Sequence, residues 1–179
     1  MKPVRFTIED AQKASDEWQF NCGPGALCAI LGLTPDELRP NLGEFEAKGY
    51  TNPTLMKETL GRCGAKWHQT YRGDSPHLMQ EFAKNGLIRI QWGGPWTKVG
   101  VPMRVRYRKT HWVGCRFVEG SKNVFQIFDV NAMCVGGWLS FGEWSERLVP
   151  WLLKKCVPKH DGTWWATHTL EVEPDAKTP

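Results

Sequence analysis

A cysteine at position 22 is the residue of this chain that is best placed to do chemistry. It precedes a Gly-Pro pair, and small apolar residues then continue to Leu31. Proline suits the first turn of a helix, because that turn has no intrahelical partner for an N–H group. The pattern predicts a helix beginning at Cys22, where the helix dipole and free N–H groups stabilise a thiolate. Such a thiolate is the nucleophile of a cysteine hydrolase, whereas an unactivated cysteine is a small buried hydrophobe.

A histidine and an aspartate follow at the ends of two predicted strands. Residues 111–118 and 124–130 are rich in β-branched and aromatic side chains, and the segment between them has turn chemistry. An antiparallel hairpin of these strands brings the start of the first beside the end of the second. His111 and Asp129 are therefore expected to be neighbours in space.

The histidine could act as a general base if a second group held its far ring nitrogen. Asp129 is the first choice for that group and Asn131 the second, since residues two apart share a face of a regular strand. Alone, His111 would be a structural histidine and Asp129 a strand-end turn former. Together with Cys22 they form the set of groups needed for acyl transfer.

The same three segments resemble a known group of enzymes. Cys22-Gly-Pro-Gly-Ala-Leu, His111-Trp-Val and Phe128-Asp-Val-Asn131 are similar to motifs of the papain-like cysteine peptidase superfamily, closest to the C39-type (double-glycine) peptidases. The resemblance implies Cys22 as nucleophile, His111 as general base and then acid, and Asp129 as its orienting partner. It also implies an α+β, papain-like fold, in which N-terminal helices include a nucleophile helix packed on a mainly antiparallel C-terminal sheet.

The sequence departs from the family pattern just before the cysteine. The family carries an oxyanion-hole glutamine several residues upstream, but the position six before Cys22 is Asp16. Gln19, three residues before, is the nearest candidate for an oxyanion donor beside the Cys22 N–H, and it fits a surface residue equally well. The family's aspartate before the cysteine is Asn21 here.

Candidate substrate contacts surround these residues in the sequence. Aromatic side chains are common in binding pockets, and the ten tryptophans are many for 179 residues. Trp144 and Trp151 are expected to be core residues. The residues expected to contact substrate are Trp18, Gly23, Trp96, Trp112 and Asn131.

Periodicity and cap residues predict the remaining elements. Helices are expected over residues 8–18, 22–31, 52–61, 76–84 and 141–155, with a short helix starting after the capping box at Thr34. Gly32 should end the second helix, and Pro150 should kink or split the last one. Strands are expected over residues 66–71, 87–92, 111–118, 124–130 and 164–172. We expect one domain over residues 1–172 and a flexible tail over 173–179.

Composition limits the expected cellular location of the protein and the classes of partner it is expected to bind. The chain has a net charge of +4, and its basic run Arg104–Lys109 is interpreted as a solvated strand edge, not as a nucleic-acid site. Without an apolar leader or a membrane-spanning run, a cytoplasmic location is expected. Six cysteines with no Cys-x-x-Cys pair predict free thiols, and no metal or cofactor is expected.

Three functions remain open from the sequence. The first is a peptidase or isopeptidase acting on a protein or peptide substrate through a thioester acyl-enzyme. The second is a peptidoglycan amidase or endopeptidase of the related Cys/His type. The third is a binding module that keeps a papain-like fold without activity. The sequence does not define the oligomeric state.

Overall fold

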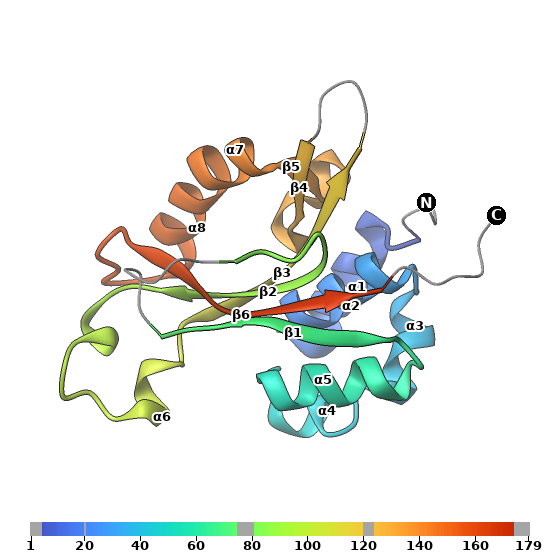
Figure 1. Ribbon diagram of the computed structural model, residues 1–179, viewed down its shortest axis with the longest axis horizontal. Helices are drawn as coiled ribbons and strands as arrows, with labels where there is room; N and C mark the ends of the chain where they lie inside the picture. Colours follow the sequence, from blue (N-terminus) through green and yellow to red (C-terminus); the bar gives the residue numbers. More distant parts are fainter. Residues whose placement is uncertain (1–4, 20, 75–80, 120–123, 174–179) are drawn as a thin grey trace.

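The chain folds around one antiparallel sheet with helices on both faces (Figure 1). The computed structural model describes residues 5–19, 21–74, 81–119 and 124–173. Within these residues the sheet has six strands in the order β1-β6-β2-β3-β4-β5, and every neighbouring pair is antiparallel. The strands are β1 Trp67–Arg72, β2 Asn85–Trp92, β3 Thr110–Val118, β4 Val124–Phe128, β5 Trp138–Ser140 and β6 Trp164–Val172.

The helices divide into an N-terminal group and a C-terminal group. The first group is α1 Ile8–Trp18, α2 Cys22–Leu31, α3 Pro35–Leu38, α4 Phe45–Lys48 and α5 Pro53–Arg62. The short α6 Met103–Arg106 lies between β2 and β3, and α7 Phe141–Glu143 and α8 Val149–Cys156 follow β5. This is the α+β layout predicted from the sequence.

Local sequence signals explain the N-terminal helices. Thr7 and Thr34 form capping boxes at the starts of α1 and α3, and the Asn52 side chain accepts from the Leu55 N–H at the start of α5. Gly32 ends α2 with a φ of 67°, a left-handed conformation that glycine adopts without strain. The predicted boundaries of α1 and α2 are confirmed.

Helix α2 packs on the sheet and places Cys22 at its own N-terminus. Leu27 of α2 is fully buried in a cluster that includes Leu87 of β2 and Leu170 of β6. At Gly114 of β3 a Cβ atom would lie 3.2 Å from the Ile30 side chain. The absence of a side chain there lets the helix approach the strand closely.

The opposite face of the sheet carries the C-terminal helices (Figure 1). The helix predicted over residues 141–155 is present, but a π-helical turn, Trp144–Leu148, lies between α7 and α8. Pro150 lies in the first turn of α8, where its missing N–H costs nothing. The irregularity lies in the turn directly before this proline, and the helical backbone continues through Pro150 itself. Trp144 is buried as expected, but the prediction of a core position for Trp151 was wrong, since it is 49% exposed.

Three further expectations were wrong or lie partly outside the described residues. Residues 76–80 of the helix predicted over 76–84 are outside them, and residues 81–84 are not helical, because their backbone groups bond to β3 and to side chains of β6. The basic run Arg104–Lys109 is no strand edge: it forms part of α6 and the turn after it. All but the first residue of the predicted tail, 173–179, also lie outside the described residues.

No helix within the described ranges is long and apolar enough to cross a membrane. The hydrophobic core consists of two clusters of buried apolar side chains, one on each face of the sheet.

The packing of α2 on the sheet is testable by a core truncation. Leu27→Ala should lower the free energy of unfolding by about 2–5 kcal/mol, because it leaves a cavity under the helix. The matched control is Ile8→Ala, at a position 51% exposed, which should change it by less than about 0.5 kcal/mol. Urea unfolding followed by tryptophan fluorescence gives both values. Equal effects of the two variants would contradict the packing described here.

Candidate active site

The hairpin of β3 and β4 brings His111 and Asp129 into direct contact. Gly114 pairs with Phe128 across the two strands, so the start of β3 lies beside the residue that follows β4. The His111 Nε2 atom is 2.9 Å from Asp129 Oδ2. Because an ionised carboxylate only accepts hydrogen bonds, Nε2 must carry the proton that it donates. This leaves the Nδ1 atom of His111 for a second partner.

The Asp129 carboxylate is fully buried and receives four hydrogen bonds. Its Oδ2 atom accepts from His111 and from the Trp144 indole N–H at 2.9 Å. Its Oδ1 atom accepts from the backbone N–H of Asn131 at 2.9 Å and from its side-chain amide at 2.8 Å. Burial alone would raise the pKa of Asp129, but the His111 charge and these donors outweigh it and lower the pKa to about 2. The carboxylate is therefore ionised at neutral pH.

Two tryptophans support this pair, and no sequence pattern predicted either role. Trp144 belongs to the π-helical turn, and its indole reaches Asp129 from the α7–α8 side of the sheet. Trp92, at the end of β2, stacks on the His111 ring with centroids 6.0 Å apart and planes inclined by 24°. Both indoles are buried, so they hold the imidazole and the carboxylate in a dry environment.

Cys22 lies at the free side of His111. Burial raises the pKa of the Cys22 thiol, but a hydrogen bond to His111 and the charge of that imidazole outweigh burial, so its pKa is lowered. The backbone N–H of Trp112 acts in the same direction. For His111, burial lowers the pKa, but Asp129 and Cys22 together raise it well above its ordinary value. The two opposite shifts favour a thiolate–imidazolium pair.

The N-terminus of α2 is left open at the cysteine. Asn21 occupies the cap position, but its side chain makes no capping hydrogen bond and instead donates to the Ala11 carbonyl at 3.1 Å. The amide thus ties α1 to the start of α2. The first N–H groups of a helix have no intrahelical partner, so those of Cys22 and Gly23 are not used by the hydrogen bonds of α2 itself.

Gly23 is needed for packing at this point. A Cβ atom there would lie 2.1 Å from the Thr51 Oγ1 atom, which no real contact allows. The Thr51 carbonyl in turn accepts the Trp112 indole N–H at 3.0 Å. The first turn of α2, the loop before α5 and strand β3 are therefore fixed to one another beside Cys22.

The other predicted substrate contacts have mixed surroundings. Trp112 is buried with its indole in the core, and the Trp96 indole folds back to donate to the Trp92 carbonyl at 2.7 Å. Asn131 is engaged with Asp129, as described above. Gln19, the predicted oxyanion donor, is exposed at the end of α1 with a φ of 60°. Its role stays a prediction.

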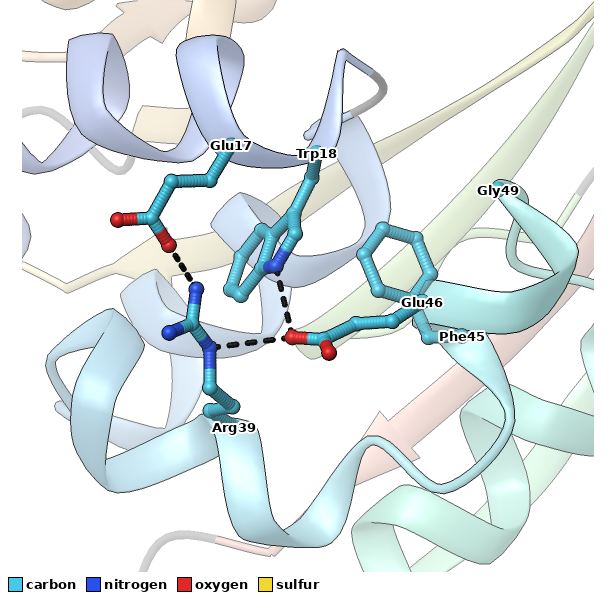
Figure 2. A pocket seen from close by; sticks show the side chains of 6 residues that line it. All are labelled: Glu17, Trp18, Arg39, Phe45, Glu46 and Gly49. Atoms are coloured by element: carbon cyan, nitrogen blue, oxygen red, sulfur yellow. Dashed lines mark hydrogen bonds and ion pairs between the residues drawn. The ribbon is translucent and has the colours of Figure 1, made fainter.

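Trp18 belongs to a separate hollow on the surface of the N-terminal helices (Figure 2). Its indole N–H donates to Glu46 at 3.0 Å, its ring meets Phe45 edge-on, and the Arg39 guanidinium lies 5.0 Å from its centre. Arg39 also pairs with Glu17 and Glu46. The hollow has a volume of about 280 Å³, and its charged groups already satisfy one another.

The cysteines and the acidic residues form no metal centre in the part of the chain that is described, where no group of three or more potential ligands gathers. All six cysteines are free thiols. Cys28 and Cys115 are fully buried, as expected of core residues, and burial raises the pKa of both.

Comparison of the chain with models of known protein families, with curated proteins and with solved structures found no match. The interpretation of the site therefore depends on its own geometry.

Acid should weaken the fold through Asp129. The pKa of Asp129 is about 2 in the folded protein against 3.8 for an ordinary aspartate, so the unfolded chain binds the proton more readily between these values. Stability from this group is present above pH 4 and should fall by about 2 kcal/mol as the pH drops through 2. Urea unfolding of wild type and Asp129→Asn at several pH values measures this loss of unfolding free energy.

The Asp129→Asn variant should show a smaller loss over this pH range, because it has no carboxylate to protonate. Asp16→Asn, at an exposed position, is the control and should keep the wild-type slope. An unchanged acid dependence in Asp129→Asn would contradict the assignment of this loss to Asp129.

Gly23→Ala should disturb Cys22 without removing any reacting group. The new Cβ displaces the first turn of α2 from Thr51, and alkylation of Cys22 should slow by about 10–100-fold. Gly23→Ala combined with Thr51→Gly should recover most of the rate, since the clashing side chain is gone. The control is Gly61→Ala in α5, where a Cβ would meet nothing within 4 Å. Failure of the double variant to recover would argue against this contact as the cause.

Proposed function

We propose that the protein is a papain-like cysteine peptidase that hydrolyses a peptide or isopeptide bond. The observation that supports this most directly is the buried His111–Asp129 hydrogen bond of 2.9 Å, with Cys22 on the other side of the imidazole. A nucleophile, a base and an orienting group in this order are the arrangement that acyl transfer requires. The packing of the nucleophile helix on an antiparallel sheet supports the papain-like assignment.

In the proposed reaction the Cys22 Sγ atom attacks the amide carbonyl carbon, and a C–S bond forms. The Nδ1–H of the His111 imidazolium then protonates the leaving amine as the C–N bond breaks, which gives a thioester and a neutral imidazole. Water, deprotonated by His111, attacks the thioester carbonyl, and the C–S bond then breaks. The acid product leaves, and the Cys22 thiolate and the His111 imidazolium are regenerated. Asp129 keeps the proton on Nε2, so Nδ1 is the atom that exchanges protons at both steps.

The oxyanion that forms during attack needs donors that are already in place. The unpartnered N–H group of Cys22 at the start of α2 meets this need, and the helix dipole adds to it. Gln19 is the proposed side-chain donor: it is exposed and lies three residues before the nucleophile. Its backbone is in the left-handed conformation, with a φ of 60°.

The proposal is tested by the pH dependence of Cys22 alkylation. Iodoacetamide should label Cys22 rapidly below pH 7, because His111 lowers the pKa of its thiol. In His111→Ala the midpoint should move toward the ordinary cysteine value of about 8.5. Mass spectrometry of the labelled peptides follows all six thiols at once, with the exposed Cys134 and Cys156 as reference thiols in the same molecule.

Labelling of Cys22 no faster than Cys134 and Cys156 would contradict the proposal and favour a binding module without activity. If the thiol is activated, hydrolysis is measured with internally quenched peptides, and Cys22→Ala is expected to abolish it while leaving the unfolding curve of the protein in place. Hydrolysis that survives in Cys22→Ala would exclude this residue as the nucleophile.

A further inference from the structure

A buried arginine lies beside the candidate active site. Arg89 is in the middle of β2 and only 5% exposed. Across the sheet it is in register with His168 of β6 on one side and Trp112 of β3 on the other. Paired residues of an antiparallel sheet project from the same face, so Arg89 shares the face that packs against α2.

Arg89 lies near Cys22 and near the residue that precedes His111. Its neighbour Trp112 contributes the backbone N–H that acts on the Cys22 thiol, and the charge of Cys22 acts on Arg89 itself. The Arg89 Nη2 atom contacts the hydroxyl of Thr110, the residue directly before His111, at 3.4 Å.

The guanidinium is poorly satisfied for a group so deeply buried. Besides the long contact to Thr110, its interaction is with the face of the Tyr107 ring, 5.1 Å from the ring centre. Its Nε atom is buried and has no hydrogen-bond partner. Within the described chain no carboxylate pairs with Arg89, whereas Arg5, Arg39 and Arg62 all have acidic partners.

An unpaired buried charge is costly for a fold and needs a reason. Burial lowers the pKa of Arg89 to about 10, a shift that Tyr107 and Cys22 oppose, so the side chain still carries its charge at neutral pH. The fold therefore keeps a cation next to the nucleophile without supplying an anion for it.

Further unsatisfied polar atoms lie on the same face. Gln91 is two residues after Arg89 on β2 and is in register with Trp165 of β6. Its Oε1 atom and the Trp165 indole nitrogen are both buried without a hydrogen-bond partner. A ligand group that bears oxygen and nitrogen atoms could satisfy such a set, whereas a purely apolar ligand could not.

The charges around Arg89 favour a ligand with a single negative charge. Burial and the neighbouring charges of Arg89, Arg72 and Lys57 lower the pKa of His168 to about 4, so His168 is neutral at pH 7. Arg72 is exposed at the edge strand β1. One desolvated guanidinium, with two or more N–H groups in one plane, matches one carboxylate.

We propose that Arg89 is a specificity-determining residue that binds a carboxylate of the substrate close to the scissile bond. The carboxylate comes either from an acidic side chain or from the free C-terminus of the substrate. This inference rests on the proposed peptidase function and names the substrate feature which that activity would select. A role limited to supporting the Cys22 thiolate would instead affect all substrates alike.

The test uses internally quenched peptides in matched pairs, with the full-length protein. In each pair one position around the cleaved bond carries Glu in one peptide and Gln in the other, and a further pair has a free or an amidated C-terminus. Wild type should prefer the carboxylate at one position by about 30-fold or more in kcat/KM, the loss expected when one partner of a buried charge pair is removed.

Arg89→Met should lose this preference, so that the ratio within that pair falls to near one. Arg39→Met, which removes an arginine that is already paired with Glu17 and Glu46, should keep the wild-type ratio. Thermal unfolding checks the fold, and Arg89→Met should be at least as stable as wild type, because it removes an unpaired buried charge.

The outcomes separate the two proposals. The position of the preferred Glu, or preference for the free terminus, identifies the source of the carboxylate. Three outcomes would overturn the role of Arg89 but not the peptidase function. Wild type could cleave without a carboxylate preference, or the preference could survive in Arg89→Met. Arg89→Met could also lose the same fraction of kcat/KM on the Glu and the Gln peptides. Absence of cleavage of every peptide by wild type would overturn the peptidase function and this inference with it.

Discussion

The buried Asp129 carboxylate is the group on which the rest of the site depends. A fully buried charge is tolerated only when its lone pairs are satisfied, and here four donors from three residues do so. Each of the three residues belongs to a different structural feature: strand β3, the turn after β4 and the π-helical turn before α8. Forming this set of bonds therefore fixes the hairpin, the C-terminal helices and the imidazole relative to one another.

The C-terminal helices take part in the site through a local irregularity. A π-helical turn widens the helix before α8, and Pro150 allows a new helix to begin directly after it. Trp144, at the start of this turn, brings its indole N–H to Asp129 while its rings fill the core between α8 and the sheet. One side chain thus serves both packing and the electrostatics of the carboxylate.

The site also contains groups that the fold leaves unsatisfied. The N-terminus of α2 lacks a side-chain cap, since Asn21 bonds to α1, and the Arg89 cation has no acidic partner among the described residues. Both features reduce stability, and both place positive electrostatic potential at Cys22. Natural folds accept such costs at functional sites, where preorganised donors stabilise charge that develops during a reaction. The hollow around Trp18 differs, because its charged groups pair with one another.

Features that depend on neighbouring residues could be predicted from the sequence. Cap residues and Gly32 defined α1 and α2, the hairpin pattern placed His111 beside Asp129, and Pro150 indicated an irregularity in the last helix. These predictions succeeded because caps, turns and proline effects act within a few residues. The side chains that meet across the sheet could not be predicted in this way, because their meeting depends on long-range strand pairing. Arg89, His168 and Trp112 come from segments up to about 80 residues apart, and their register follows from strand pairing that no local pattern encodes. The indole of Trp144 reached Asp129, and Trp151 faced solvent, because a π-helical turn changed the helical phase that the sequence pattern assumed.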